Sequence, residues 1–406
     1  MAVIKHTAQK AASAWREFLR LESAGGLILV AAALLALVLA NTPLADLYTR
    51  LLSLKLTVMV ETVGVSKPLL LWVNDGLMAI FFLLVGLELK REVVEGELSR
   101  PEQIALPALA AIGGLVVPAV IYWLVNRGNP EGFNGWAVPT ATDIAFALAI
   151  LSLLGNRVPA SLKVFLTTIA IFDDLAAIVI IALFYSSDLS TAALAAAGAG
   201  IAALFVLNRM GVKSLAAYLI VGIFIWFFVL KSGVHATLAG IAVAAFIPLE
   251  GGDEHSPSRH LEHILHPWVA FGVLPLFAFA NAGLALAGVG LDDVTGTVST
   301  GILLGLFFGK QIGVFGMTAL VIGLGMARKP EGASWAMLYG IALLCGVGFT
   351  MSLFIGSLAF EHGGFSNIAA LKIGVISGSV ASAFCGWLVL HLSLPKAAPT
   401  PQTDSL

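Results

Sequence analysis

The 406-residue chain is poor in charged residues, which make up 11 % of it. An average soluble domain is about 25 % charged, so this chain has too little polar surface to cover a soluble globule. It also lacks an excess of basic residues: 22 Lys and Arg against 24 Asp and Glu give a net charge of −2, which provides no electrostatic footprint for nucleic acid. Only two cysteines are present, Cys345 and Cys385, both in apolar runs, which excludes a disulfide framework and a cysteine-based zinc site.

Long apolar runs are abundant, because hydrophobic residues make up 59 % of the chain. A helix that spans a bilayer needs about 20 mostly apolar residues. Runs of this length predict an all-α membrane protein with twelve transmembrane helices. The predicted spans lie near residues 24–40, 69–89, 104–125, 135–154, 161–185, 190–208, 214–230, 233–249, 267–287, 300–325, 335–360 and 367–392. We therefore expect an amphipathic cytoplasmic N-terminus at 1–23, a single transmembrane domain at 24–392 and a short cytoplasmic tail at 393–406.

The distribution of Lys and Arg between the predicted loops indicates how the chain crosses the membrane. Of the 22, 15 fall on the side of the N-terminus, five on the opposite side, and two, Lys310 and Lys372, inside spans. Cytoplasmic loops carry the excess of Lys and Arg. Both termini are therefore expected in the cytoplasm, which is consistent with an even number of spans, because such a number places both termini on one side.

One external segment, residues 51–67, alternates β-branched and polar residues around a turn at 61–64. This pattern predicts a short β-hairpin, with an irregular loop as the alternative. A lone two-stranded hairpin is marginally stable in water, so we expect this one to pack against a partner.

Two of the predicted spans contain residues that interrupt helices. The fourth has Pro139 beside a polar stretch at 140–143, and the eleventh contains the glycine-rich run CGVGFT at 345–350. Proline removes a backbone donor, glycine weakens a helix, and backbone freed at membrane depth is tolerated only where it is buried in protein or lines water. These spans are the middle members of two triplets, spans 3–5 and 10–12, which predicts the inverted repeats and paired broken helices of secondary transporters.

Several charged residues fall inside the predicted spans, among them Asp143, Asp173, Asp174 and Lys310. Each ionisable group costs at least about 2.5–3.5 kcal/mol at the bilayer centre, so a functional role is expected. Asp173 and Asp174 are neighbours on one helix and point about 100° apart. One should therefore face an ion path and the other a neighbouring helix, where Lys310 is the available cation. The alternative is a purely structural charge cluster.

The residues around these charges predict what kind of ligand they bind. Carboxylates, hydroxyls and freed carbonyls are hard oxygen ligands, and Thr142 adds a hydroxyl next to Asp143. Such a set suits a small hard cation rather than a soft metal, and protons would compete with that cation for the same carboxylates. Where broken helices bring like ends together, Asp143 can offset the positive N-terminal ends and Lys310 the negative C-terminal ends.

A second group of titratable residues lies at the predicted cytoplasmic ends of the second and ninth spans. Such a group can sense cytoplasmic pH, or it can form an ordinary solvated interface. Its members are Glu88, Arg91, Glu92, Arg259, Glu262 and His263.

Three other ionisable residues in or beside predicted spans can be explained without a part in transport. The side chain of Lys372 can snorkel to the surface, Asp75 begins a helix, where an acid is favourable, and His235 lies at a helix end.

Seven ordered segments between about residue 20 and residue 392 carry a more specific pattern. They are NDGLMAIFFLLVGLELKRE (74–92), ATDIAFAL (141–148), FDDLAAIVIIALFY (172–185), LKSGVHATLAGI (230–241), LEHILHPWV (261–269), LPLFAFANAG (274–283) and CGVGFTMSLFIGSLAF (345–360). Together they resemble the NhaA family of sodium/proton antiporters. The resemblance implies a bacterial inner-membrane antiporter, not an enzyme, that exchanges cytoplasmic Na⁺ or Li⁺ for external H⁺. It further implies electrogenic exchange of two protons per sodium ion, activation at alkaline pH, a role in pH and sodium homeostasis, and no cofactor.

Carried over by position, the resemblance assigns roles to the buried charges. It makes Asp174 the principal cation ligand and Asp173 its partner, which can pair with Lys310. Asp143 then compensates the helix dipoles beside the break in the fourth span, with Thr142 next to it. The six cytoplasmic residues named above fall in the family's pH-response region.

The resemblance also implies a homodimer, because residues 51–67 lie where family members dimerise. Three residues depart from the family pattern: Phe172 stands where Ile is usual, Gln311 where Pro is common, and His260 in place of a basic residue. Phe172 could narrow the cation site and His260 could change the activating pH. None of the three removes a group that carries a proton or a cation.

Other classes of membrane protein fit the sequence less well. A prenyltransferase-like enzyme needs two Asp-rich metal motifs, whereas DDLAA at 173–177 lacks the third acid and has no second copy. An intramembrane aspartyl protease needs Gly before its catalytic Asp, whereas Thr142 and Phe172 precede the candidates. A passive channel and a sodium-coupled solute symporter stay open as alternatives. Broken helices and a titratable pair favour alternating access over the channel, and no cluster of Trp, Arg and Asn at mid-membrane predicts an organic substrate.

Overall fold

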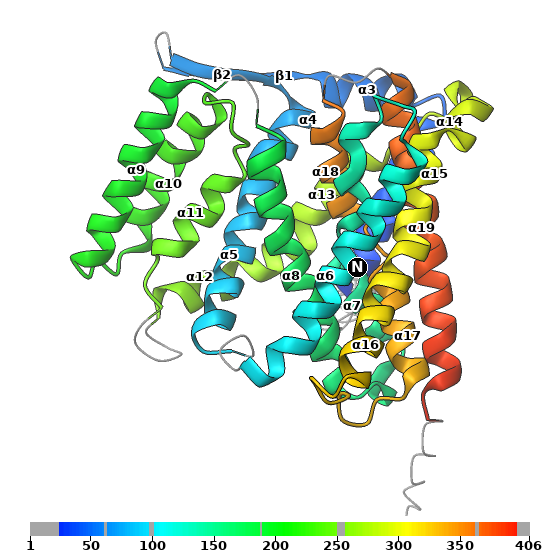
Figure 1. The fold of residues 1–406 in the computed structure, drawn as a ribbon. Helices are drawn as coiled ribbons and strands as arrows, with labels where there is room; N and C mark the ends of the chain where they lie inside the picture. Colours follow the sequence, from blue (N-terminus) through cyan, green and yellow to red (C-terminus); the bar gives the residue numbers. More distant parts are fainter. Residues whose placement is uncertain are drawn as a thin grey trace, which may run out of the picture.

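The computed structural model describes residues 24–60, 63–96, 101–186, 189–249, 256–361 and 365–395. The described chain is an α-helical bundle with one small β-hairpin lying across its end (Figure 1). The predicted amphipathic segment at 1–23 lies outside the described residues, as do residues 396–406 of the predicted tail.

The elements follow one another with short connections, and the η labels mark 3₁₀ or π-helical segments. Up to residue 184 they are α2 (Ala24–Ala40), α3 (Ala45–Ser53), β1 (Lys55–Val60), β2 (Val63–Pro68), α4 (Leu69–Trp72), η1 (Val73–Leu77), α5 (Met78–Val94), α6 (Pro101–Val125), η3 (Phe133–Thr140), α7 (Ile144–Leu153), η4 (Gly155–Arg157) and α8 (Ala160–Phe184). Beyond it they are α9 (Thr191–Arg209), α10 (Leu215–Leu230), α11 (Leu238–Phe246), α12 (Pro257–Trp268), η5 (Val269–Val273), α13 (Leu274–Ala282), η6 (Leu286–Gly288), α14 (Leu291–Thr295), α15 (Thr297–Leu304), η7 (Gly305–Gly309), η8 (Gln311–Phe315), α16 (Gly316–Gly323), α17 (Trp335–Leu344), α18 (Phe349–Ala359) and α19 (Phe365–Ser393).

The number of membrane spans differs from the prediction. Among the described residues, eight helices are long and apolar enough to cross a membrane, and two bent helix pairs raise this number to ten, against the twelve predicted. The bent pairs are α2 with α3, at 113°, and α17 with α18, at 41°. The predicted spans at 214–230 and 233–249 correspond to α10, of 16 residues, and α11, of nine. The turn between them contains Gly233 with φ 82°, a left-handed conformation that only glycine adopts without strain, and the chain leaves helical geometry there.

Both predicted interruptions are present. In the fourth span, the 3₁₀ segment η3 ends at Thr140, residues 141–143 are extended, and α7 begins at Ile144. In the eleventh, α17 ends at Leu344 and α18 begins at Phe349. The inverted-repeat relation between the two triplets of spans stays a prediction.

The predicted hairpin is also confirmed, although it is shorter than predicted, and its external location stays a prediction. Strands β1 and β2 pair antiparallel, with Val58 opposite Val65. Residues 51–53 belong instead to the end of helix α3. That helix is anchored to α13, because the hydroxyl of Tyr48 donates to the carbonyl of Phe279 at 2.7 Å, and this tertiary contact favours helix over strand.

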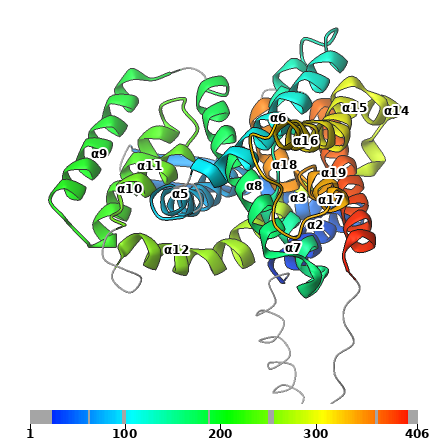
Figure 2. The ribbon, with the colours of Figure 1, turned by 60° about the horizontal axis from the view of Figure 1, so that its bottom comes forward.

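The helices form two groups that meet along the middle of the molecule (Figure 2). In one group, α11 packs on α5 and α10 packs on α9, around a core that includes Leu83, Leu204 and Val243. In the other, α15 and α17 pack on α19, and α6 packs on η8. Both interrupted segments lie in this second group with their freed backbone buried, as a chain in a membrane requires.

Candidate functional site

The two interrupted segments cross at Asp143. Its backbone N–H donates to the carbonyl of Val347 in the other break, at 2.6 Å. Its carboxylate caps α7, because Oδ1 accepts from the N–H of Phe146 at 3.0 Å. The same carboxylate reaches the first turn of α18, where Oδ2 accepts from the N–H of Thr350 at 2.9 Å and from its hydroxyl at 2.5 Å. One carboxylate therefore lies at the N-termini of two helices, where helix dipoles favour an anion.

A second buried cluster joins α8 to the predicted tenth span. Lys310 Nζ lies 2.6 Å from Asp173 Oδ2 and 3.0 Å from the hydroxyl oxygen of Thr142. That hydroxyl lies 2.5 Å from the same Asp173 oxygen and 2.9 Å from the carbonyl oxygen of Cys345, the residue that follows α17. Asp173 Oδ1 has no hydrogen-bond partner among the described residues. Both charged side chains are fully enclosed, so each depends on the other for compensation of its charge.

Asp174, the next residue of α8, is placed differently. It is 4 % exposed, and its side chain makes no hydrogen bond or ion pair within the described part of the chain. Its carboxylate interacts electrostatically with the acids Asp173, Glu88 and Asp143 and with Lys310. The adjacent acids thus diverge around the helix: one is hydrogen-bonded to Lys310, and the other lies among several acids without a hydrogen-bond partner in the described chain.

Local backbone geometry encloses Lys310. This residue lies between two π-helical turns, η7 and η8, and such turns widen a helix and are frequent at functional sites. On α6, Gly113 allows close approach of η8, since a Cβ on Gly113 would lie 2.2 Å from the carbonyl oxygen of Gly313. The neighbouring Gly114 packs against the end of the Lys310 side chain, because a Cβ at Gly114 would lie 3.6 Å from Lys310 Nζ.

The structure places close together the five residues predicted to bind the cation or to compensate charge, and it adds two groups that the sequence reasoning missed. These are the side chain of Thr350, which binds Asp143, and the carbonyl of Cys345, which faces Thr142. A hydroxyl inside an apolar, interrupted span is a signal that could have identified Thr350, because such hydroxyls hydrogen-bond across helices in membranes. No local signal identifies a carbonyl.

Replacing Thr350 by Val is expected to destabilise the crossing of the two segments. The substitution removes a hydrogen bond to the carboxylate of Asp143 and leaves its shape nearly unchanged, which should cost about 1–3 kcal/mol. Thermal denaturation in detergent measures the change. Thr318→Val is the matched control, since Thr318 is also buried but its hydroxyl binds only the carbonyl of Val314 in its own helix. Equal shifts for the two variants would contradict a special role for the Thr350 contact.

The predicted cytoplasmic residues come together between α5 and α12. Arg91 Nε donates to Glu262 Oε1 at 3.0 Å, and another guanidinium nitrogen of Arg91 lies 2.8 Å from Glu92. Glu88, one turn earlier on α5, interacts electrostatically with these three residues. Because Glu88 also interacts with Asp174, it connects this cluster to the buried acids.

The other two predicted residues of this group lie on α12 and differ from each other. Arg259 pairs with Glu95, which follows α5. His263 is exposed, and its ring makes no hydrogen bond or ion pair with the part of the chain that the structure describes. The structure therefore connects Arg259 to the end of α5 but leaves His263 apart from the other members of the group.

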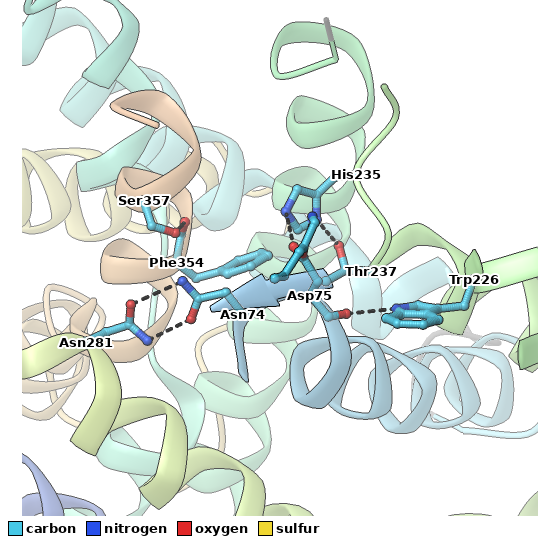
Figure 3. Close-up of polar contacts among 9 residues, drawn as sticks. Asn74, Asp75, Trp226, His235, Thr237, Asn281, Phe354 and Ser357 are labelled. Carbon is cyan, nitrogen blue, oxygen red and sulfur yellow. Dashed lines mark hydrogen bonds and ion pairs between the residues drawn. The ribbon is translucent and has the colours of Figure 1, made fainter. Parts of the chain in front are cut away.

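A polar cavity of about 450 Å³ lies on the hairpin side of the crossing. Asp75, in the π-helical segment η1, pairs there with Lys67 Nζ at 2.7 Å and with His235 Nε2 at 3.5 Å. Asn74 and Asn281 exchange two amide hydrogen bonds, at 2.8 and 3.3 Å (Figure 3). Asp75 and His235 are thus partners of each other. His235 precedes helix α11 as predicted, but Asp75 lies inside the continuous helical stretch Leu69–Val94, so the prediction that it begins a helix is wrong.

Helix α18 connects this cavity to the crossing. Its Phe354, one turn beyond Thr350, packs edge-on against the ring of His235 with centroids 5.4 Å apart (Figure 3). Lys372 also lines the cavity, and its amine donates to the carbonyl of Gly283 at 2.6 Å. This lysine therefore caps the end of α13, and the prediction that it snorkels to the surface is wrong.

A helical bundle in which two interrupted segments cross, with three acids and one lysine enclosed beside the crossing, defines a multi-pass membrane transporter. Comparison with known proteins identifies its family. The chain belongs to the Na⁺/H⁺ antiporter 1 family, whose sequence profile matches residues 16–390. The family consists of transporters and not of enzymes, as the sequence predicted.

Individual relatives agree over nearly their whole length. The chain is 58 % identical to a protein named Na⁺/H⁺ antiporter NhaA from Pseudomonas fluorescens, over 93 % of this chain and 96 % of that protein. It is 58 % identical to one of the same name from Campylobacter concisus, over 93 % of each, and 56 % identical to one from Bordetella parapertussis, over 96 % of this chain and 99 % of that protein. These matches confirm the family resemblance of the seven sequence segments.

Proposed function

We propose that this protein is a secondary active transporter of the bacterial inner membrane that exchanges cytoplasmic Na⁺ or Li⁺ for external H⁺ and so serves pH and sodium homeostasis. Its family and the names of its relatives support Na⁺/H⁺ exchange. One observation carries the proposal. Of two adjacent enclosed carboxylates, Asp173 is held by Lys310, while Asp174 makes no hydrogen bond within the described chain. An enclosed acid without a partner is poised to bind a proton or a cation.

The cation site proposed here consists of the carboxylates of Asp174 and Asp173 and the hydroxyl of Thr142. All are hard oxygen ligands, which suit Na⁺ and Li⁺. A cation binds carboxylates in their deprotonated form, so its arrival releases the protons that they held. A cation at Asp173 also competes with Lys310 for the same carboxylate, which gives the lysine a direct part in binding.

Asp143 and Lys310 act as charge-compensating residues in this account. The carboxylate of Asp143 lies at the N-termini of α7 and α18, and Lys310 lies beside the hydroxyl that contacts the C-terminal carbonyl at Cys345. Opposite charges at opposite helix ends stabilise the crossing of the interrupted segments. Through the same contacts, a change of charge at the cation site can alter the positions of α7, α17 and α18, the helices on either side of the two breaks.

The exchange cycle follows from competition at one site. Cytoplasmic Na⁺ displaces protons inward, the interrupted segments move against the rest of the bundle, and external protons then displace Na⁺. Because the proposed exchange of two protons per Na⁺ moves one net charge, a potential of 100 mV contributes about 2.3 kcal/mol to each cycle.

Cation-induced movement of protons in everted membrane vesicles tests the proposed function. Addition of NaCl or LiCl should dissipate a pH gradient at alkaline pH, while KCl, the matched control for ionic strength, should not. Absence of a response to any of the three salts over the tested pH range would overturn the proposal and favour symport of an organic solute.

We also propose that the cytoplasmic cluster sets the activation at alkaline pH. It consists of Glu88, Arg91, Glu92, Arg259, Glu262 and His263. The links from Glu262 through Arg91 to α5, and from Glu88 to Asp174, support a path from the cytoplasmic surface to the cation site. His263 has the weakest structural support, since it is exposed and apart from the others.

Replacing Glu262 by Gln is expected to make transport depend less steeply on pH between about pH 6.5 and 8.5, because Arg91 loses its ion-pair partner on α12. The rate at the optimal pH should change little. Cation-induced proton movement in vesicles, recorded as a function of pH, measures the effect. Glu331→Gln, at an exposed loop glutamate, is the control. An unchanged profile for the Glu262 variant would remove this residue from the pH response.

For the arrangement in the membrane, we propose that both termini lie in the cytoplasm and that residues 24–392 form one transmembrane domain. The segment at 51–67 would then be external, and we propose that it joins two copies into a homodimer. The two-stranded sheet supports this, since each strand has an unpaired edge to which a strand of a second copy can add.

A further inference from the structure

An apolar groove of about 740 Å³ lies beneath the hairpin, between α4 and α5 on one side and α10, α11 and α13 on the other. Its lining is almost wholly apolar, and four of the lining side chains are open to the surroundings: Ile80 is 37 % exposed, Leu51 41 %, Leu276 53 % and Ile223 68 %. None of the residues assigned above to cation binding or to the pH response lines it. The groove is thus a feature separate from the exchange site.

The groove is hollow because one helix beside it is short and one lining residue lacks a side chain. Helix α11 has nine residues, whereas α4, η1 and α5 form one continuous helical stretch, Leu69–Val94. Gly76 is the lining glycine that leaves space, while Gly222 and Gly240 allow close packing of their helices. A Cβ on Gly76 would meet nothing closer than the ring of Trp226, at 4.0 Å. Space therefore remains where side chains would fill an ordinary helix interface.

Two tryptophans mark the end of the groove that is nearest the hairpin. The rings of Trp72 and Trp226 lie against each other with centroids 5.9 Å apart, and both residues line the groove. The indole N–H of Trp72 donates to the carbonyl of Leu56 in β1, and that of Trp226 donates to the carbonyl of Asp75 (Figure 3). Tryptophan gathers at the boundary between headgroups and hydrocarbon, so the groove runs from this boundary into the hydrocarbon layer.

Basic residues flank the same end. Arg50 lies in the last turn of α3, directly before the lining residues Leu51 and Leu52, and Lys55 begins β1 next to Leu56. Both basic side chains are exposed. Helix α3 is bent by 113° from α2 and lies across the end of the bundle (Figure 1). An apolar groove with cationic side chains at its interfacial end is complementary to one lipid molecule with an acyl chain and a phosphate.

We propose that this groove binds an anionic phospholipid from the leaflet on the hairpin side, with an acyl chain between α5 and α10 and the phosphate near Arg50 and Lys55. The bound chain would fill the space between the two helices and support α5, which also carries residues of the cytoplasmic cluster. The lipid is then a structural ligand of the protein and not part of the exchanging lipid shell.

Native mass spectrometry of delipidated protein with phosphatidylglycerol added back tests the proposal. The unmodified protein should retain one lipid after detergent exchange. Ile223→Trp, which fills the groove, should retain about ten-fold less. Ile220→Trp is the matched control, because Ile220 lies on the same helix and is equally exposed at 68 % but does not line the groove. Arg50→Gln and Lys55→Gln should each weaken retention about five-fold.

Two results would overturn the proposal. Equal retention by the Ile223 and Ile220 variants would show that the lipid adheres to the general apolar surface. A lipid-free dimer that is lost specifically in Ile223→Trp would show that a second copy of the chain covers the groove. Lipid retention is measured without transport, so failure of the exchange proposal would leave this result interpretable.

Discussion

Replacement of Asp174 by Asn is expected to reduce Na⁺-induced proton movement by at least about 100-fold. Loss of a charged ligand costs a bound cation roughly 3 kcal/mol, and the amide can no longer release a proton. Everted vesicles that contain equal amounts of protein measure the effect. The structure adds a second expectation, that thermal stability does not fall. Asp174 has no hydrogen-bond partner to lose within the described chain, and its replacement removes an ionisable group from an enclosed position.

The combination of lost transport and retained stability separates a functional acid from a structural one. Asp292→Asn, at an exposed position in α14, controls for the loss of an acid elsewhere and should leave both properties unchanged. An Asp174→Asn protein that still moves protons in response to Na⁺ would show that the cation binds elsewhere.

Replacement of Lys310 by Met is expected to lower the free energy of unfolding by about 3–5 kcal/mol. The substitution keeps much of the side-chain volume but leaves the carboxylate of Asp173 enclosed without its cation. Thermal denaturation in detergent measures the loss. The double variant Asp173→Asn with Lys310→Met removes both charges and should recover most of the stability, since replacement of both members of a buried pair is often neutral.

Equal stabilities of the Lys310 single variant and the double variant would contradict the proposed pairing. The transport properties of two further variants address whether Lys310 itself carries a proton. Lys310→Arg keeps the charge, whereas Lys310→Gln removes it. An active but electroneutral Gln variant would assign the lysine a proton-carrying role, and an active, electrogenic one would limit it to stabilisation of the site.

The interrupted helices and the hairpin could be predicted from the sequence, because their causes are local. Pro139 and the glycines of the run at 345–350 act on their own backbone, and alternation of side chains sets the strand pattern of 55–68. The number of spans could not be predicted equally well. Composition makes 214–230 and 233–249 look alike as spans, but helix α11 ends after nine residues. Its length depends on the turns on either side and on its packing against α5, which are tertiary effects.

The site shows the same division between local and long-range causes. Helix periodicity predicts that Asp173 and Asp174 face in different directions. The free-energy cost of placing an ionisable group inside a membrane identifies both acids and Lys310 as candidate functional residues. Sequence reasoning could mark Thr350 only as a hydroxyl in an interrupted span and could not pair it with Asp143, since the two are 207 residues apart and meet only where the two breaks cross. The π-helical turns beside Lys310 likewise have no local sequence signature that we could use.

Proton release on Na⁺ binding to the purified protein tests the central claim most directly, that Na⁺ and H⁺ compete for the same enclosed carboxylates. In weakly buffered detergent solution, a pH indicator records the protons released per Na⁺ bound, with KCl as the control. The account predicts release of about two protons per Na⁺ near neutral pH, less at high pH where the carboxylates are already deprotonated, and none from Asp174→Asn. Binding of Na⁺ to the unmodified protein without release of protons would contradict it.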